Sequence, residues 1–248
     1  MLDQVLNFSL TPQLQTPFLL LILIGLEAVL SADNAVALAA IAQGIQGSDR
    51  QRNALNVGMF LAYVLRIILI LTATWVVKFW QFELLGAAYL LWLVFNYFTS
   101  QEQDESHDRG FHFASMWQAI PMIAVTDLAF SLDSVTTAIA VSDRTWLIIA
   151  GGTIGVITLR FLAGLFLRWL DIYTHLEDAG FITVGFVGLR LLLRVVYPDL
   201  APPEWLMITA IVCTFIWGFS KRNEPESSRE ISPMPVKAIE TREKQKQN

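Results

Sequence analysis

Two octets of the sequence place acidic side chains in the middle of long apolar runs. The first, Glu27–Asn34, reads EAVLSADN, and the second, Asp127–Ser134, reads DLAFSLDS. Acid, serine and aspartate recur in the same order, and every matched position is displaced by 100 residues. An ionisable group at the centre of a membrane-spanning helix costs about 3 kcal/mol or more, so such groups persist where they face a cavity, a partner charge or an ion. The repetition therefore indicates a functional polar site inside a membrane.

The polar side chains of the two octets are all oxygen donors. Carboxylate, amide and hydroxyl oxygens suit magnesium, calcium and manganese, whereas copper and zinc prefer histidine and cysteine. The three histidines fall in expected loops, and the single cysteine, Cys213, lies in an apolar run where we expect it to serve packing. Four central acids and two arginines of neighbouring spans leave a charge of about −2, which one divalent cation would neutralise. These residues are Glu27, Asp33, Asp127, Asp133, Arg66 and Arg160.

The composition predicts an all-α, polytopic membrane protein. Of 248 residues, 54% are hydrophobic and only 16% are charged, and the mean hydropathy is +0.51. Apolar runs long enough to cross a bilayer predict about seven transmembrane helices, with tryptophan and tyrosine near their ends. The expected spans are Pro17–Ile41, Ala54–Val77, Phe82–Phe98, Ala114–Val141, Trp146–Trp169, Phe181–Val196 and Trp205–Phe219.

The duplication extends beyond the octets. Arg66 matches Arg160, and the start of the third span, Glu83–Gly86, matches the start of the sixth, Glu177–Gly180, all at one offset of 94. Each unit would therefore cross the membrane three times, and an odd number of crossings inverts the second copy, as in many transporters. The first unit carries six more residues between its aspartate and its arginine, which we expect in the loop Gln43–Asn53.

Loops and tail complete the expected organisation. An N-terminal lead (1–16) precedes the first repeat (17–98), an acidic loop (99–113), the second repeat (114–197), the seventh helix (205–219) and a tail (220–248) expected to be disordered. Lysine and arginine in the loops place the N-terminus outside and the acidic loop and tail in the cytoplasm.

The two acids of one octet cannot lie on one face of a straight helix. Glu27, Ser31 and Asn34 share a stripe, but Asp33 lies about 240° from Glu27 around the helix axis. Serine, aspartate and asparagine compete with helical backbone hydrogen bonds. We therefore expect a helix break near Ser31–Asn34 and at the matching place in the second octet, which would free backbone carbonyls as ligands.

Six supporting residues have a functional and a structural interpretation. The arginines either take part in cation exchange or act as struts that each pair with one acid. The serines either line the site or bond back to the preceding turn, and the glutamates are expected as interfacial helix caps more often than as ligands. These residues are Arg66, Arg160, Ser31, Ser131, Glu83 and Glu177.

The octets, the paired arginines and the two Glu-x-x-Gly starts resemble the TerC family of integral membrane proteins, over roughly Pro17 to Phe219. The resemblance implies a manganese(II) exporter, related more distantly to a superfamily of lysine and cation exporters. Some members are linked by name to tellurite resistance, and others to the maturation of membrane proteins or exoenzymes. Carried over by position, the cation site would comprise Glu27, Asp33, Asn34, Asp127, Asp133 and Ser134.

We therefore predict a divalent-cation exporter, not an enzyme, that works by alternating access around a midplane site. Manganese(II) is the expected substrate, calcium and magnesium are the alternatives, and protons are the candidate coupling ion. The expected partners are this cation and the lipid bilayer of a bacterial inner membrane or a thylakoid, with no nucleic acid and no organic cofactor; no oligomeric state is predicted. An assembly factor without transport would leave the duplicated acids unexplained, and an intramembrane aspartyl protease would need a Gly-x-Gly-Asp setting that neither octet has.

Overall fold

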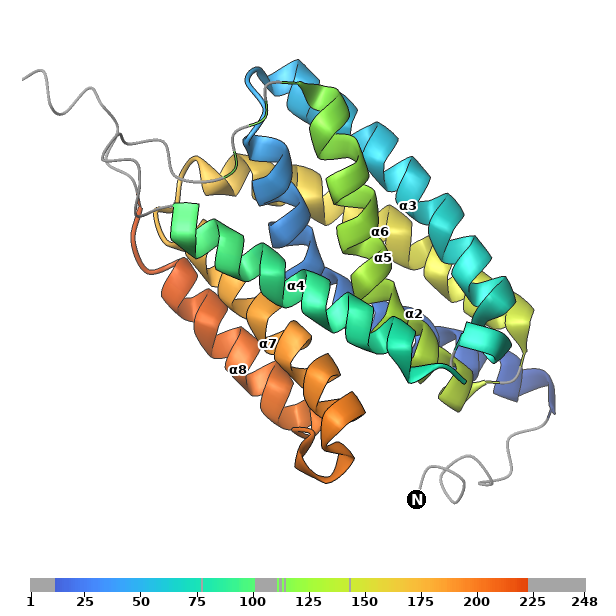
Figure 1. Cartoon of the computed structure of the whole chain (residues 1–248). Helices are drawn as coiled ribbons and strands as arrows, with labels where there is room; N and C mark the ends of the chain where they lie inside the picture. The colour runs from blue at the N-terminus through green and yellow to red at the C-terminus, as the bar shows by residue number, and fades with distance from the viewer. Residues whose placement is uncertain are drawn as a thin grey trace, which may run out of the picture.

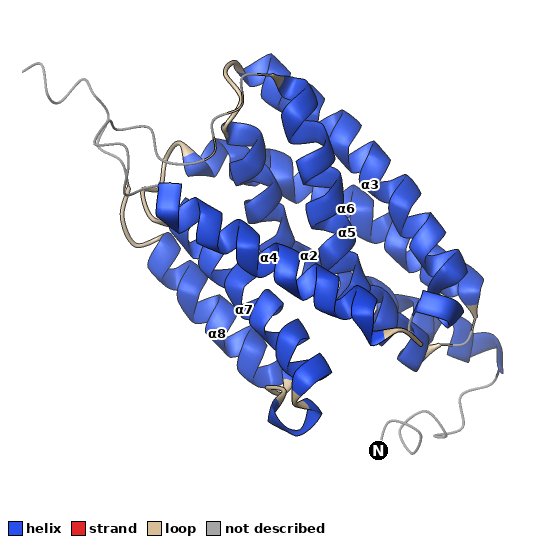
Figure 2. Ribbon diagram, in the orientation of Figure 1, coloured by secondary structure: helices blue, strands red, loops and turns tan. Residues whose placement is uncertain are grey.

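The described part of the chain is built from helices. The computed structural model describes residues 12–222 except 77, 101–110, 112, 114 and 143, and not the side chains of 12–16, 26–30, 32, 33, 74, 100 and 204. In chain order the helices are α2 (Pro12–Gln43), α3 (Ser48–Val76), α4 (Trp80–Ser100), α5 (Met116–Val141), α6 (Thr145–Leu170), α7 (Leu176–Val196), the 3-10 turn η1 (Pro198–Leu200) and α8 (Glu204–Gly218). Within these residues the only β pairing is in two isolated bridges (Figure 2). Five described helices, α3 to α7, are long and apolar enough to cross a membrane, which confirms an all-helical polytopic membrane protein.

The connection between α2 and α3 is shorter than the sequence predicts. α3 begins at Ser48, and the turn before it ends at Gly47, whose φ of 97° is open to glycine without steric cost. The prediction of a long loop over Gln43–Asn53 is therefore wrong. Most of the six extra residues of the first repeat are helical. Two of them lengthen the end of α2 after Asp33, compared with the end of α5 after Asp133. Three more lengthen the start of α3 before Arg66, compared with the start of α6 before Arg160. Helices can extend past the hydrocarbon because the headgroup region solvates their charged first turns.

The two expected repeats pack against each other more than within themselves. α2 lies mainly against α6, α3 mainly against α5, and α4 against α7, with further contact of α2 with α5 and of α3 with α6. In the expected repeat α2 corresponds to α5, α3 to α6 and α4 to α7. Exchanging the corresponding helices turns the α2–α6 contact into the α3–α5 contact and leaves the other three contacts unchanged. In Figure 1 the two octet helices, α2 and α5, run in opposite directions through the bundle. The figure also shows α4, α7 and α8 alongside one another on one side, with α3, α5 and α6 on the other.

Two matched glycines bring α4 and α7 close to the octet helices. Gly86 of α4 faces Leu132 of α5, and its counterpart Gly180 of α7 faces Val36 of α2. A Cβ atom at either glycine would collide with the facing side chain. Small residues at such places let membrane helices approach closely. Each Glu-x-x-Gly start therefore docks onto a helix that carries an acidic octet.

Both octet helices continue through their octets, so the expected helix break near Ser31–Asn34 and in the second octet is wrong. In α5 the hydroxyl groups bond within the helix: Ser131 Oγ donates to the Asp127 carbonyl at 2.7 Å, and Thr137 Oγ1 donates to the Asp133 carbonyl at 2.9 Å. The carboxylates of both aspartates bind arginines of other helices. The competition with backbone hydrogen bonds that would open the helix is thereby removed.

Candidate functional site

A buried ion pair joins the first acid of the second octet to the arginine of the first repeat. Asp127 on α5 and Arg66 on α3 are 1% and 2% exposed, and Arg66 Nη2 lies 3.4 Å from Asp127 Oδ1. The pair exists because α3 and α5 pack along their apolar faces and bring the two positions together. Each charge of the pair helps to compensate the other, since an uncompensated buried charge is strongly destabilising.

A hydrogen bond from α4 fixes the orientation of α5 at this place. Thr126, the residue before Asp127, is fully buried, and its Oγ1 lies 2.8 Å from the Tyr89 hydroxyl of α4. This contact limits rotation of α5 about its axis and so keeps Asp127 directed toward α3. Neither residue is a member of the expected site, because their pairing depends on how α4 crosses α5.

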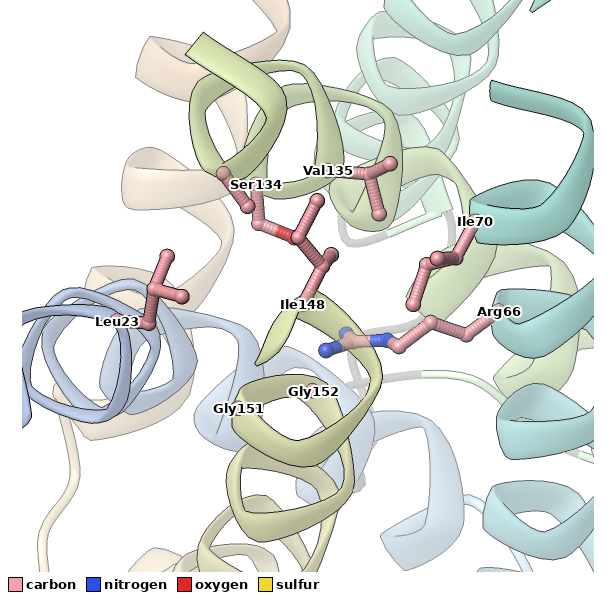
Figure 3. A pocket seen from close by; sticks show the side chains of 9 residues that line it. Leu23, Arg66, Ile70, Ser134, Val135, Ile148, Gly151 and Gly152 are labelled. Carbon is pink, nitrogen blue, oxygen red and sulfur yellow. The ribbon is translucent and has the colours of Figure 1, made fainter. Parts of the chain in front are cut away.

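A small cavity adjoins Arg66 where four helices meet. Its volume is about 10 Å³, enough for roughly one water-sized species. Figure 3 shows Arg66 extending from α3 between Ser134 of α5 and the glycines of α6. The cavity is lined by Leu23, Arg66, Ile70, Ser134, Val135, Ala138, Ile148, Gly151 and Gly152. Arg66 and Ser134 are its polar lining, so a cation entering here would meet Ser134 only after displacing the positive charge of Arg66.

The second acid of the octet, Asp133, is held by two arginines of α7. Arg190 Nη1 donates to Asp133 Oδ2 and Arg194 Nη1 donates to Oδ1, each at 2.7 Å. These lengths are typical of strong charge-assisted hydrogen bonds. The arginines lie four residues apart on one helix, which lets both reach the same carboxylate. Neither belongs to the expected site; the sequence signal that identifies them is a pair of arginines at i and i+4 inside an apolar run.

Glu83 extends this polar group to α4. It lies in the first turn of α4, as a helix cap would, and close enough to Asp133 and Arg194 to interact with both charges. A second cavity of about 10 Å³ lies between Glu83, the C-terminal part of α3 and Leu132, Val135 and Thr136 of α5. Val135 also lines the cavity beside Arg66. Val135 therefore borders both the space beside Arg66 and the space beside Glu83.

The remaining supporting residues lie apart from these two acids. Arg160 Nε donates to Asn56 Oδ1 at 2.7 Å, in a groove between α3 and α6. The expected pairing of Arg160 with an acid of the site is thus not found among the described residues. Glu177 lies in the first turn of α7, at the opposite end of that helix from Arg190 and Arg194. Its position fits the interpretation as a helix cap.

The first octet is described in part. Ser31 and Asn34 of α2 are buried, whereas the side chains of Glu27 and Asp33 lie outside the described residues. In the second octet Ser131 bonds back to the preceding turn, as the structural interpretation expects, and Ser134 Oγ lies 3.4 Å from the Ser131 carbonyl. Among the described side chains, no three of histidine, cysteine, aspartate and glutamate gather as they would around a metal.

The described charges of the site balance one another. Three carboxylates face three guanidinium groups, and by sequence the two acids of the first octet add a charge of −2. One divalent cation would neutralise that excess. The balanced set is Glu83, Asp127, Asp133, Arg66, Arg190 and Arg194.

Comparison with known proteins identifies the family to which the chain belongs. The model of the "Integral membrane protein TerC family" matches residues 14–225. The uncharacterized membrane protein YceF of Bacillus subtilis (strain 168) is 36% identical over 177 residues, which cover 68% of each chain. YkoY of the same organism is 30% identical over 73% of this chain and 61% of its own length. The inner membrane protein YgdQ of Escherichia coli (strain K12) is 29% identical over 56% of this chain and 64% of its own length.

The chain thus spans 61% to 68% of the length of these relatives. No solved structure matches the chain. The family match runs through both acidic octets and the helices that supply Arg66, Glu83, Arg190 and Arg194. With these elements inside the matched region, the chain belongs to the TerC family of integral membrane proteins.

Proposed function

We propose that this chain exports a divalent metal cation, with manganese(II) as the substrate, by alternating access around the acids of α2 and α5. The observation that carries the proposal is that both acids of the second octet, Asp127 and Asp133, are bound by arginines of other helices. Ionisable residues at membrane depth are typical of ion pathways, where they pair with one another or with the ion. Membership of a family linked to metal-ion homeostasis supports the same function.

The ion pairs suggest how the site fills and empties. Arg66 reaches Asp127 from α3, and Arg190 and Arg194 reach Asp133 from α7, so relative movement of these helices changes both pairings at once. The guanidinium groups occupy the carboxylates when no metal is bound, and the cation replaces them when the helices separate. This exchange keeps the buried carboxylates compensated in both states, which avoids the cost of a bare charge in a low-dielectric interior.

The donor atoms favour a hard cation. Asp127, Asp133 and Ser134 offer oxygen atoms, as do Glu27, Asp33 and Asn34 of the first octet by sequence. Oxygen donors suit manganese, magnesium and calcium. A carboxylate-rich site that binds a cation after partial dehydration disfavours magnesium, which gives up its water reluctantly. Manganese is therefore the proposed substrate, with calcium as the competitor to be tested.

The proposed mechanism uses two inverted repeats, 17–98 and 114–197. The contact pattern that survives exchange of the repeats, and the opposite directions of α2 and α5, support this relation. Two inverted halves give a transporter two alternative packings, one facing each side of the membrane. The loop charges favour an N-terminus outside. In the proposed cycle the ion enters from the cytoplasmic side and the outward-facing packing releases it.

Two other functions are weaker fits. In an intramembrane aspartyl protease two carboxylates from facing helices share a proton, but Asp127 and Asp133 lie on one helix and bind different arginines. An assembly factor for other membrane proteins needs no pair of acidic octets with arginine partners. Its candidacy rests on the family's wider range of roles and is decided by a transport measurement.

The proposal is tested with the purified full-length chain in liposomes that contain a metal-sensitive fluorophore. We expect manganese flux in the wild type, loss of flux in Asp127→Asn and Asp133→Asn, and normal flux in Asp199→Asn. Asp199 is the matched control because it is an exposed carboxylate in η1, away from the octets. A larger flux of calcium than of manganese would identify calcium, and not manganese, as the substrate. Absence of flux for any of these cations, with correctly inserted protein, would favour the assembly role.

A further inference from the structure

A basic groove lies between α3 and α6, apart from the acidic site. It has a volume of about 760 Å³, far larger than the two cavities around Val135. Three guanidinium groups line it, from Arg52 in the first turns of α3 and from Arg160 and Arg168 of α6. Asp49 is the one carboxylate of its described lining. The groove therefore carries a net charge of about +2 in a region bounded by apolar helices.

The three arginines of the groove lack anionic partners among the described residues. Arg160 binds the neutral side-chain amide of Asn56, and Arg52 lies close enough to Arg160 for the two positive charges to repel each other. No described carboxylate lies within ion-pair distance of these three guanidinium groups. Positive charges that exceed the negative charge of a concave surface are stabilised when an anion binds among them.

Gly164 makes room for this arrangement. It lies one turn after Arg160 on α6, and a Cβ atom placed there would come within 3.0 Å of Arg160 Nη1. A larger residue would push the guanidinium out of its position against Asn56. The backbone of α6 thus leaves the space in which Arg160 contributes to the groove floor, while Arg52 and Arg168 form its exposed rim.

The depth of the groove matches the polar part of a lipid. Arg168 lies in the last turn of α6, and Arg160 lies about 12 Å deeper at the rise of an α-helix. That interval covers the headgroup layer and the start of the hydrocarbon region. Deeper than the arginines the helices present exposed apolar side chains, Phe60 of α3 and Ile157 of α6, and the exposed Phe161 lines the groove itself. A ligand there would have a negatively charged head and an apolar body.

We propose that the groove between α3 and α6 binds the phosphate group of an anionic phospholipid, with Arg52, Arg160 and Arg168 as its ligands. Arginine suits this role because its planar guanidinium group donates two parallel hydrogen bonds to phosphate oxygens. A divalent cation would be repelled by the three charges, so the groove is distinct from the metal pathway. The chemistry that a lipid headgroup shares with free phosphate is an anionic phosphate group, and the apolar surface deeper than the arginines favours a lipid over free phosphate.

Native mass spectrometry of the full-length protein in detergent tests the assignment, with added phosphatidylglycerol, phosphatidylcholine or inorganic phosphate. We expect retention of phosphatidylglycerol by the wild type and a roughly tenfold weaker retention in the double variant Arg52→Gln/Arg168→Gln. Both side chains are exposed, so the double variant is expected to fold. Arg50→Gln is the control for the change at Arg52, because it removes one positive charge from the same helix end without touching the groove lining.

Each other result contradicts the assignment. Equal retention by all variants, or an equal loss in Arg50→Gln, would overturn it. Inorganic phosphate that binds the wild type and prevents retention of phosphatidylglycerol would assign the groove to the free anion instead. Arg160→Gln, which changes the arginine on the groove floor, should also weaken the retention of phosphatidylglycerol. If Arg160→Gln does not fold, the double variant alone tests the assignment. None of these measurements depends on metal transport. A failure of the lipid proposal is therefore distinguishable from a failure of the proposed transport function.

Discussion

The guanidinium group of Arg66 and the carboxylate of Asp127 face each other at 3.4 Å, where both side chains are almost wholly buried. Asp133, in contrast, is bound at 2.7 Å by two arginines that are 13% and 29% exposed. The deeper pair is therefore the looser one, held by charge more than by short hydrogen bonds. A competing cation meets less resistance at Asp127 than the burial of that residue suggests.

Replacing Arg66 with methionine separates an exchanging charge from a structural strut. The substitution leaves the Asp127 charge without its 3.4 Å partner. We expect tighter manganese binding and slower turnover, because the freed carboxylate holds the metal and no guanidinium competes for release. Metal affinity by calorimetry and flux in liposomes are measured on the same preparation. Unchanged affinity with normal turnover per folded molecule would identify a strut.

The double variant Arg66→Met/Asp127→Asn measures how strongly the pair is coupled. Each single variant removes one partner of this buried ion pair and should cost about 3–5 kcal/mol of stability. The double variant removes both charges and should recover most of that loss. Thermal unfolding in detergent is the readout. Strictly additive losses would show that the two side chains contribute independently.

Asp133→Asn should abolish flux with a modest loss of stability. The amide keeps one oxygen acceptor, but its NH2 group cannot accept a hydrogen bond. One of the two arginine hydrogen bonds is therefore lost and the other loses its negative partner, at a cost of about 1–3 kcal/mol. Arg194 can turn toward solvent and Glu83 remains nearby, so the helices stay packed. Comparison with Asp199→Asn corrects for any general effect of removing a carboxylate. Wild-type flux in Asp133→Asn would remove this residue from the cation site.

The two arginines of α7 should not be equivalent. Arg190 is the more buried of the pair and Arg194 the more exposed. Solvent screens the second interaction more strongly. We expect Arg190→Met to lower the melting temperature and alter flux more than Arg194→Met does. The opposite order would show that proximity to Glu83, rather than burial, determines the contribution.

Val135 should control passage between the two small cavities. Val135→Ala would join the space beside Arg66 to the space beside Glu83 and is expected to raise the rate of flux. Val135→Phe would fill both spaces and lower it. Flux of both variants is compared at equal protein insertion, because either change costs about 1–3 kcal/mol of packing energy. Equal rates in the two variants would place the pathway elsewhere.

Topology is tested with single cysteines in a Cys213→Ser background. In the proposed orientation, Ser228→Cys in the tail stays unlabelled by a membrane-impermeant thiol reagent on intact cells. Asp199→Cys, in the exposed turn between α7 and α8, is labelled. The reversed pattern would show that the tail lies outside, which would contradict the proposed orientation and leave the direction of transport open.

Hydropathy was sufficient to locate the helices, because a bilayer imposes a length and an apolar composition on each crossing. It could not locate their ends: α3 starts at Ser48, where charged residues are solvated at the membrane surface. The expected helix break failed for a different reason. Whether Ser131 opens the helix or bonds back within it depends on what its neighbours bind, and Asp127 and Asp133 bind arginines on α3 and α7.

The repeat predicted the acids better than their partners. Internal symmetry identifies Arg66 and Arg160 as equivalent, and only Arg66 reaches a described acid. At the positions that match Arg190 and Arg194, the first repeat has Asn96 and Ser100, so the symmetry gives no signal for the pair that binds Asp133. Such pairings are determined by contacts between helices. An internal sequence repeat carries no information about these contacts.

The packing of α2 against α6 has a consequence for biosynthesis. A ribosome completes α2, with both of its acids, more than one hundred residues before it completes α6. During that interval the first octet has no native neighbour from the second half, so α2 must wait at the insertion machinery or pair provisionally with α3. We therefore expect the chain to assemble late, and a fragment ending after α4 would leave the helix that carries the first octet without the surface of α6 against which it packs.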